Sequence, residues 1–282
     1  MLFRSFEMRR TADTPTLLEA TQQELSNIST RAKVLTGDDI AIAGFIIEGG
    51  SKCVVIRARG PSLAQYGVPS PLPDPNLRLT TLQGALLAEN DDWMSQANPN
   101  HVTVIQDLGL ADMDTQDASL YSCLDEGLYT ALLSGSGNET GIGIIEVFDA
   151  DTGLPFMSNI STRAKVGTGD DVTIAGFIIE GDTPRQVIIR GRGPSLAQYG
   201  IPGVLQDPTL TLTTLNGTGI AENDNWRSDD ESALSATGLA PEDDLEAAIL
   251  ITLDPGLYTA ILQGYAATTG VAIVEVFDLT GR

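Results

Sequence analysis

Residues 26–34 read Ser-Asn-Ile-Ser-Thr-Arg-Ala-Lys-Val, and the same block returns at residues 158–166. A second block, Ile-Ala-Gly-Phe-Ile-Ile-Glu-Gly at residues 42–49, returns at residues 174–181. The spacing between matching blocks stays between about 129 and 133 residues along the chain, far above the roughly 20 to 50 residues of a solenoid unit. Each copy is therefore long enough to be a domain with its own core. The other matching blocks start at Gly60 and Gly193, Ala88 and Ala221, Gly127 and Gly256, and Glu146 and Glu275.

The repeat spacing divides the 282-residue chain into four parts. We expect an N-terminal extension at 1–24, a first repeat at 25–150, a linker at 151–156 and a second repeat at 157–282. The linker is short and carries Pro155, which restricts the angle between the parts that it joins.

Short apolar or alternating segments between Gly, Pro and Asp turns predict β-strands in both copies. Residues 62–66, after Pro61, predict one helical turn that stops at Gly67, and residues 111–120 and 241–249 have a weak helical pattern. We therefore expect an all-β protein made of two tandem β-sandwiches of the jelly-roll or immunoglobulin-like kind. The strands expected in the first copy, after the one that holds residues 27–31, are 40–47, 52–58, 76–82, 85–88, 128–134 and 142–148.

Several short motifs recur in both copies and carry a resemblance. They are, in the first copy, Asn-Ile-Ser-Thr-Arg (27–31), Gly-Asp-Asp (37–39), Ile-Ala-Gly-Phe-Ile-Ile (42–47), Gly-Pro-Ser-Leu (60–63), Glu-Asn-Asp-x-Trp (89–93), Gly-Leu-Tyr-Thr-Ala (127–131) and Glu-Val-Phe-Asp (146–149). This series resembles a repeat domain of large bacterial surface and secreted proteins, which often carry immunoglobulin-like modules alongside. The Gly-Leu-Tyr-Thr-Ala strand is also similar, more loosely, to the bacterial pre-peptidase C-terminal β-sandwich. The resemblance spans nearly all of residues 25–282 and implies an extracellular β-sandwich with no defined activity.

The overall charge excludes some classes of partner. The net charge is -22 and the pI is near 4.1, so the surface repels phosphate backbones and nucleic-acid binding is not expected. No apolar run approaches the roughly 20 residues of a membrane-spanning helix. Charged residues interrupt the apolar start of residues 1–24, so this segment does not have the pattern of a signal peptide.

The sequence shows no catalytic constellation. His101 is the sole histidine, and the second copy has no counterpart for it. A base needs a nucleophile and an orienting partner, and no phosphate-binding loop, zinc-ligand cluster or nucleophile elbow is present. We predict that the protein is not an enzyme; a hydrolase whose site the sequence does not reveal is the alternative.

Acidic loops recur at matching positions and raise a calcium hypothesis. Oxygen-rich loops of this kind can bind Ca²⁺, although no EF-hand spacing is present. The alternative is that these residues form solvated turns and Asx caps. The candidate ligands are Asp91, Asp92, Asp114, Asp117, Asp224 and Asp243.

Cys53 and Cys123 are the two cysteines, and the second copy has Gln186 and Thr252 in their places. Because both are present in one copy and both are absent from the other, we predict a disulfide between two strands of the first repeat. Such a bond would imply an oxidising compartment. The alternative is a pair of free thiols.

Basic residues gather in the early part of each copy: none occurs from Leu79 to Thr162, and after Arg192 the second copy has Arg227 and Arg282 alone. One interpretation is pairing within a domain, with Arg57 and Arg59 meeting Asp residues in turns. The other is an end-to-end polarity that favours head-to-tail contacts between molecules. The basic residues concerned are Arg31, Lys33, Lys52, Arg57, Arg59 and Arg78 in the first copy, and Arg163, Lys165, Arg185, Arg190 and Arg192 in the second.

The phase of the repeats suggests a function. The chain stops at 278–282, which matches the point where the first copy passes into the linker, so the C-terminus of one molecule could meet the N-terminus of the next. We expect a non-catalytic extracellular or cell-surface protein that assembles head to tail into a filament or stalk, joined by an added N-terminal strand. The residues predicted to make that contact are Thr16, Leu17, Leu18 and Leu25.

The alternative function is an adhesion module of a secreted protein that binds glycan or matrix. An exposed aromatic platform at Trp93 or Trp226 would favour this function, because sugars stack on such rings. Burial of both rings at the edge of a sandwich is the expectation from the sequence.

Overall fold

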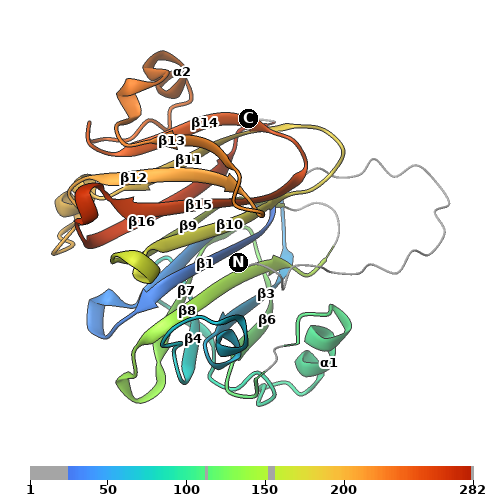
Figure 1. Ribbon diagram of the computed structural model, residues 1–282. Helices are drawn as coiled ribbons and strands as arrows, with labels where there is room; N and C mark the ends of the chain where they lie inside the picture. The colour runs from blue at the N-terminus through green and yellow to red at the C-terminus, as the bar shows by residue number, and fades with distance from the viewer. Residues whose placement is uncertain (1–24, 112–113, 152–155, 281–282) are drawn as a thin grey trace.

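The computed structural model describes residues 25–111, 114–151 and 156–280. This part of the chain is a 16-stranded antiparallel assembly, so the all-β prediction is confirmed (Figure 1). The strands of the first repeat are β1 (Leu25–Val34), β2 (Ala41–Glu48), β3 (Lys52–Arg59), β4 (Pro75–Thr81), β5 (Leu86–Asn90), β6 (Ala118–Leu124), β7 (Gly127–Gly135) and β8 (Gly141–Asp149). Those of the second are β9 (Phe156–Val166), β10 (Thr173–Ile179), β11 (Arg185–Arg192), β12 (Pro208–Thr214), β13 (Gly219–Asn223), β14 (Ala247–Leu253), β15 (Gly256–Gly264) and β16 (Gly270–Asp278).

Helical structure is confined to short segments between strands. The turn predicted after Pro61 is a 3₁₀ helix, η3 (Pro61–Tyr66), and Gly67 ends it in the left-handed region at φ 75°. The weak helical predictions for 111–120 and 241–249 are wrong, because these stretches run into β6 and β14. In the described ranges the α-helices are α1 (Asn100–Asp107) and α2 (Glu231–Ala236), which lie at opposite ends of the molecule (Figure 1). No helix in the described ranges is long and apolar enough to span a membrane.

The strands form two long runs, and each run contains strands of both repeats. One run follows the order β6-β3-β8-β1-β10-β15-β12-β13. The other follows β14-β11-β16-β9-β2-β7-β4-β5. The first four strands of each run belong to one repeat and the last four to the other. The two repeats therefore extend one another's sheets at the middle of the molecule.

The main core lies between these runs. Residues of β2 alternate between buried and half-buried, as period-two side-chain alternation requires, and β10 supplies the matching residues of the second repeat. A single cluster of buried apolar side chains extends through both repeats, from Phe45 and Leu133 in the first to Phe177 and Leu262 in the second. Most of its members are aliphatic, in keeping with an aromatic content of 5%.

A smaller apolar cluster covers the outer face of each repeat. In the first repeat, Trp93, Ile105 and Phe148 pack together beneath the segment that contains α1. In the second, Trp226, Leu234 and Phe277 pack beneath α2. Both tryptophan rings are buried, as expected from the sequence. These caps explain why β3, β6 and β8 are buried on both faces.

Candidate functional site

The first strand of each repeat lies at the junction between the two copies. β1 pairs with β8 of its own repeat and, on its other side, with β10 of the second repeat. β9 pairs in the same way with β16 of its own repeat and with β2 of the first repeat. The contact is reciprocal, as at an isologous twofold interface, although here one chain supplies both sides. We call this junction, made of β1, β2, β9, β10 and the two Gly-Asp-Asp turns at 37–39 and 169–171, the seam.

Ion pairs cross the seam from the first repeat to the second. The Arg31 guanidinium, 3% exposed, donates to the Asp170 carbonyl oxygen and lies 3.9 Å from the Asp170 carboxylate. The Lys33 ammonium lies 3.4 Å from the Asp171 carboxylate. Burial lowers the pKa of Arg31 from its ordinary value, and the charges of Asp170 and Asp171 oppose that shift.

The same contacts run in the opposite direction. Lys165 lies 3.8 Å from the carboxylate of Asp39, and Arg163 donates to the Asp38 carbonyl oxygen at 3.1 Å. The repeated Arg-x-Lys and Gly-Asp-Asp motifs are therefore two halves of one contact, and each copy supplies both halves. Pairing these charges within one domain was one interpretation of the sequence; for this set the partners lie in the other repeat.

Two threonines meet at the centre of the seam. The hydroxyls of Thr30 and Thr162 are 2.8 Å apart, and these are equivalent residues, 132 positions apart in the chain. Both are 1% exposed. Nearby, Lys33 and Lys165 are register partners at the crossing of β1 and β9. Equivalent residues facing each other place the local twofold axis at this point.

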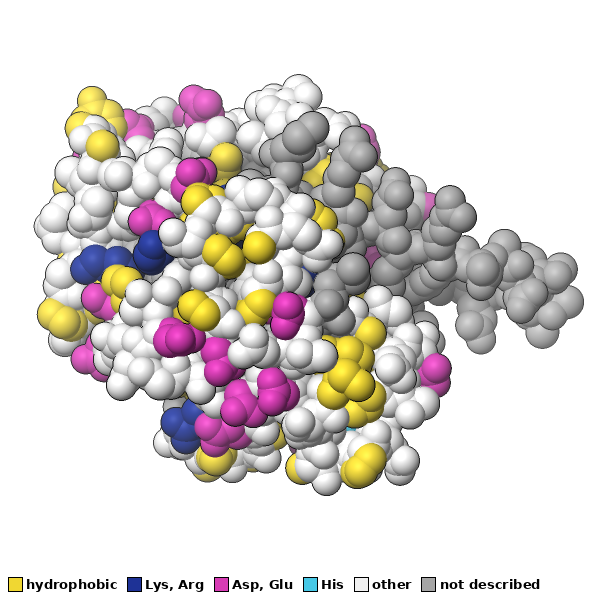
Figure 2. Space-filling view, turned by 60° about the horizontal axis from the view of Figure 1, so that its bottom comes forward, with side chains coloured by type: hydrophobic (Ala, Val, Ile, Leu, Met, Phe, Trp, Pro, Cys, Tyr) yellow, Lys and Arg dark blue, Asp and Glu magenta, His cyan; other side chains and the backbone are white. Residues whose placement is uncertain are grey.

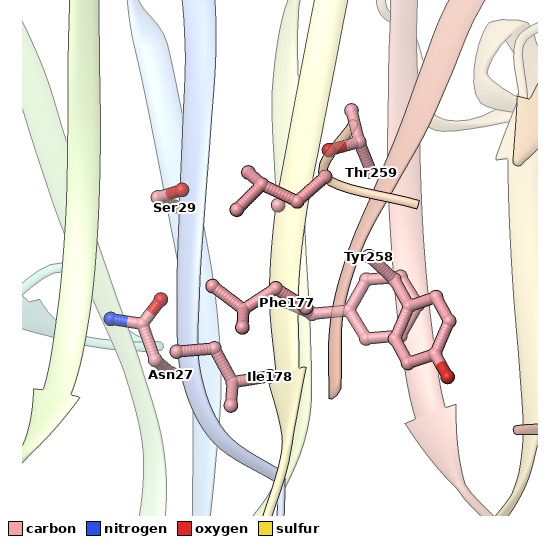
Figure 3. A pocket seen from close by; sticks show the side chains of 9 residues that line it. Asn27, Ser29, Phe177, Ile178, Tyr258 and Thr259 are labelled. Carbon is pink, nitrogen blue, oxygen red and sulfur yellow. The ribbon is translucent and has the colours of Figure 1, made fainter. Parts of the chain in front are cut away.

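A small hollow lies along the seam (Figure 3). Asn27 and Ser29 come from β1, Phe177 comes from β10, and Tyr258 and Thr259 come from β15. The rings of Phe177 and Tyr258 stack with centroids 5.6 Å apart. The hollow takes in about 10 Å³, which is about the space of one water molecule, so it is too small for an organic ligand.

A second repeated ion pair holds each repeat together internally. Arg57 on β3 donates to the Glu146 carboxylate at 2.9 and 2.5 Å and to the Leu110 carbonyl oxygen at 3.0 Å. Its guanidinium also lies over the Phe148 ring, 4.7 Å from the centroid. Glu146 is 1% exposed. Arg57 thus pairs within its repeat, but with a strand glutamate instead of the expected turn aspartate.

A buried carboxylate fixes the Gly-Pro-Ser turn of each repeat. Asp117 is fully buried and accepts a hydrogen bond from the Gly60 amide at 2.8 Å. In the second repeat Glu246 accepts from the Gly193 and Ser195 amides and from the Ser195 hydroxyl. Burial raises the pKa of Asp117, and hydrogen bonds from Gly60 and Ser62 oppose the rise. Asp117, one of the predicted calcium ligands, therefore accepts hydrogen bonds from backbone amides of its own repeat.

Two other calcium candidates form local turns. The Asp114 carboxylate accepts from the Gln116 amide, and its carbonyl oxygen accepts from the Trp93 indole at 3.1 Å. In the second repeat, the Asp243 carboxylate accepts from the Leu245 amide, and the Asp243 carbonyl oxygen accepts from the Trp226 indole. These contacts are the Asx-turn alternative that the sequence left open.

The remaining calcium candidates each lie near a further carboxylate, Asp74 in the first repeat and Asp207 in the second, that was not among the predicted ligands. Burial raises the pKa of Asp74, and the nearby charges of Asp91 and Asp92 raise it further. Asp207, beside Asp224, repeats this arrangement in the second copy. Within the described ranges, no three His, Cys, Asp or Glu side chains are placed to share a metal ion. The calcium hypothesis stays a prediction.

The end of each repeat is clamped to its β3 or β11 strand. The fully buried Lys52 ammonium lies 2.6 Å from the Asp149 carboxylate and 3.2 Å from that of Asp151. In the second repeat, Arg185 lies 2.8 Å from Asp278. Burial raises the pKa of Asp149 to about 6, and the hydrogen bond and charge of Lys52 oppose this shift.

Cys53 and Cys123 form a disulfide, as predicted. They lie directly opposite one another on β3 and β6. Gln186 and Thr252 are the equivalent register partners on β11 and β14. The second repeat thus keeps the strand pair without the covalent bond.

His101 and the N-terminal residues complete the set of candidates. His101 lies in α1, and its ring meets the edge of Tyr121 with centroids 5.1 Å apart. Leu25 is the first residue of β1, and its backbone pairs with Ile179 of the same chain. Thr16, Leu17 and Leu18 fall outside the described residues.

The seam was not predicted from the sequence, although the repeated blocks carry a signal for it. The blocks that repeat without change at 26–34 and 158–166 carry basic residues on a strand, and each is followed by a turn with two aspartates. An identical motif with both signs of charge in each copy is what reciprocal pairing between copies requires. The partners, such as Lys33 and Asp171, are 138 residues apart in the chain, so the sequence pattern did not show that they meet.

Comparisons with known proteins identify no relative. No family model matches the chain, and no curated protein matches it. One similar solved structure is a DUF4785 family protein from Legionella pneumophila, at 12% identity and a TM-score of 0.26, covering 95% of this chain and 69% of that chain. A likeness at that level carries no argument about fold or function.

Proposed function

We propose that the protein is a non-catalytic structural protein, a subunit that assembles end to end into an extracellular filament or stalk. The observation that carries this proposal is the seam. At the seam, the sheets of one copy continue into those of the other, and residues that repeat without change in both copies make the contact. Because each seam contact is made by one repeat on another, the equivalent repeat of a second chain has the surface needed to take that place and link chains in series.

The chemistry elsewhere in the molecule supports a structural role. The repeated charged groups Arg57, Glu146 and Asp117 are engaged with one another or with backbone atoms of the same repeat. The Cys53–Cys123 disulfide supports placement outside the cell, where oxidising conditions maintain such bonds. Acidic side chains predominate over basic ones on the face in Figure 2, in keeping with the net charge of -22.

The test is negative-stain electron microscopy of the full chain, together with light scattering over a range of protein concentration. We expect filaments with an axial repeat that matches one molecule. A variant that lacks residues 1–24 tests the predicted N-terminal strand: loss of filaments supports that strand, and their persistence places the joint elsewhere. Monodisperse monomers at every concentration, for both proteins, would overturn the filament proposal.

A second candidate function, glycan binding, has one observation in its favour. A hollow of about 320 Å³ lies beside Tyr265, whose side chain is 57% exposed, with Thr209 and Gln263 on its wall. An exposed ring next to polar side chains suits a sugar. The buried Trp93 and Trp226 provide no such platform.

A glycan array probed with the full chain tests this second function. Binding that is lost in Tyr265→Ala and kept in Tyr199→Ala would support it, because Tyr199 is 65% exposed but lies outside the hollow. Equal binding by both variants, or none by the wild type, would rule against a site at Tyr265.

A further inference from the structure

We propose that chains join through the seam, with repeat 1 of one chain paired to repeat 2 of the next in place of its own. The partner is a second copy of this chain. The inference rests on the proposed filament and names its joint. It replaces an added N-terminal strand with an exchange of whole repeats.

Each repeat keeps its own strands when the seam opens. β1 remains paired with β8 from Asn27 opposite Phe148 to Val34 opposite Gly141. β9 remains paired with β16 from Asn159 opposite Phe277 to Val166 opposite Gly270. The pairs that separate are β1 with β10, β9 with β2, and the single crossing of β1 and β9 at Lys33 and Lys165. Opening the seam therefore divides the molecule between repeats, and not within one.

A second chain offers the same surface as the chain's own second repeat. Lys33 of one chain would meet Asp171 of the other, and Asp39 would meet Lys165. Every seam contact is recreated, so the exchange leaves the contact energy unchanged. If two chains exchange repeats mutually, the result is a closed dimer. If each chain passes its repeat on to the next, the result is an open series.

Concentration decides between the closed and exchanged forms. Pairing within one chain benefits from an effective concentration on the order of millimolar, because a short joint holds the repeats together. Exchange is therefore favoured where chains are crowded, or where they fold side by side. Dilute protein is expected to be monomeric with its seam closed.

The outer edges of the sheets are less suitable as a joint. Of the four strands that end the two runs, β5 and β13 carry exposed apolar side chains, with Leu86 49% exposed and Ile220 36% exposed. However, Glu89 and Glu222 lie on the same strands and are exposed. Pairing these edges would bring like charges together, which destabilises cross-strand pairs. The seam instead brings opposite charges together.

The axis threonines allow a direct test. We would make Thr30→Cys and Thr162→Cys as separate full-length variants, refold them together at high concentration, and oxidise the mixture mildly. Because Thr30 and Thr162 are buried against each other, a new disulfide can join two chains when β1 of one meets β9 of the other. We expect covalent heterodimers on non-reducing gels, several-fold above the dimers of either variant alone or of the wild type. The double variant in one chain, oxidised when dilute, should close internally, and this checks the geometry.

The outcomes separate the joint from the function. Filaments without heterodimers would overturn the exchanged seam and leave the filament standing. Dimers of Thr30→Cys alone, as abundant as the heterodimers, would show pairing between two first repeats and would also overturn the proposal. If neither filaments nor heterodimers form, both proposals fall. Heterodimers without filaments would support the exchange and confine it to closed dimers, against the filament.

Discussion

The two repeats perform the same structural tasks, partly with different chemistry. Both pair a buried Arg with a strand Glu, and both supply an Arg-x-Lys strand and a Gly-Asp-Asp turn to the seam. They differ where β3 meets β6: the first repeat has a disulfide, and the second has Gln186 opposite Thr252. Residues that build the contact between copies are the same in both, and so are the turn block at 60–67 and 193–200 and the Arg–Glu pair that lie within each repeat. The disulfide position is one place where the two copies diverge.

The largest effect is expected at the buried Arg–Glu pair that both repeats share. Arg57→Met would leave Glu146, 1% exposed, without its counter-charge and should lower the free energy of unfolding by about 4 kcal/mol. Arg190→Met tests the equivalent pair with Glu275. Because Glu275 is 9% exposed, this substitution should lower the free energy of unfolding by less than Arg57→Met does. Urea denaturation measures both. Equal, small losses would show that neither carboxylate depends on its arginine.

The disulfide is the clearest difference between the repeats. Replacing Cys53 and Cys123 by the residues of the second repeat, Gln and Thr, should lower the free energy of unfolding by about 3 kcal/mol, since the bond closes a long loop between residues 70 positions apart. The reverse graft, Gln186→Cys with Thr252→Cys, should add stability to the second repeat. Both variants would be compared with the wild type by denaturant melts, with and without reductant. A wild-type midpoint unmoved by reductant would contradict the prediction.

Charge reversal at the seam should have a moderate effect. Lys33 and Asp171 are 25% and 41% exposed, so Lys33→Glu should cost about 1 kcal/mol, partly from lost attraction and partly from new repulsion. Asp171→Lys in the same chain should restore most of that loss. Thermal melts of the two single variants and the double variant give the coupling energy. Additive losses would mean that the two side chains do not act as a pair.

The turn before the last strand of each repeat offers a substitution that should give a small gain in the free energy of unfolding. The first repeat has Gly137 and Asn138 in the left-handed region, whereas the second has Ala266 at φ 50° and Ala267 at φ 63°. Ala266→Gly should raise the free energy of unfolding by about 1 kcal/mol, because glycine has no Cβ to clash there. Gly137→Ala is the reverse change and should lower it by a similar amount. A destabilised Ala266→Gly would indicate that this turn is not strained.

The last effect is confined to a narrow pH range and is expected at Asp149. Burial raises its pKa to about 6, whereas the same carboxyl in the unfolded chain has a pKa near 4. Between about pH 4 and pH 6, the folded chain therefore keeps a proton on Asp149 that the unfolded chain has released. The stabilisation from this proton is full below about pH 4 and is lost as pH rises through about 6. Asp149→Asn should remove that part of the pH dependence. An NMR titration of the Asp149 carboxyl with a midpoint near 4 would contradict this assignment.

Most strands could be predicted because one face of each packs on the core and leaves a period-two pattern, as in β2. β6 and β14 could not, since they begin with Ala-Ser-Leu and Ala-Ala-Ile, which are buried in succession and lack the runs of Val and Ile that reveal the equally buried β3 and β8. The disulfide followed from the difference between copies. The seam did not, because Lys33 and its partner Asp171 are 138 residues apart and pair across copies.

The position of β1 between β8 and β10 also sets the order in which the chain can fold during synthesis. Its first partner ends at Asp149 and its second at Ile179, so the strand made first must wait until the second repeat has begun. Contacts this distant in sequence form slowly, and a strand without its neighbours exposes open edges in the meantime. Nascent chains on neighbouring ribosomes, or emerging together from a membrane, would meet while these edges are still open. The timing of translation thus becomes a determinant of whether a chain closes on itself or on its neighbour.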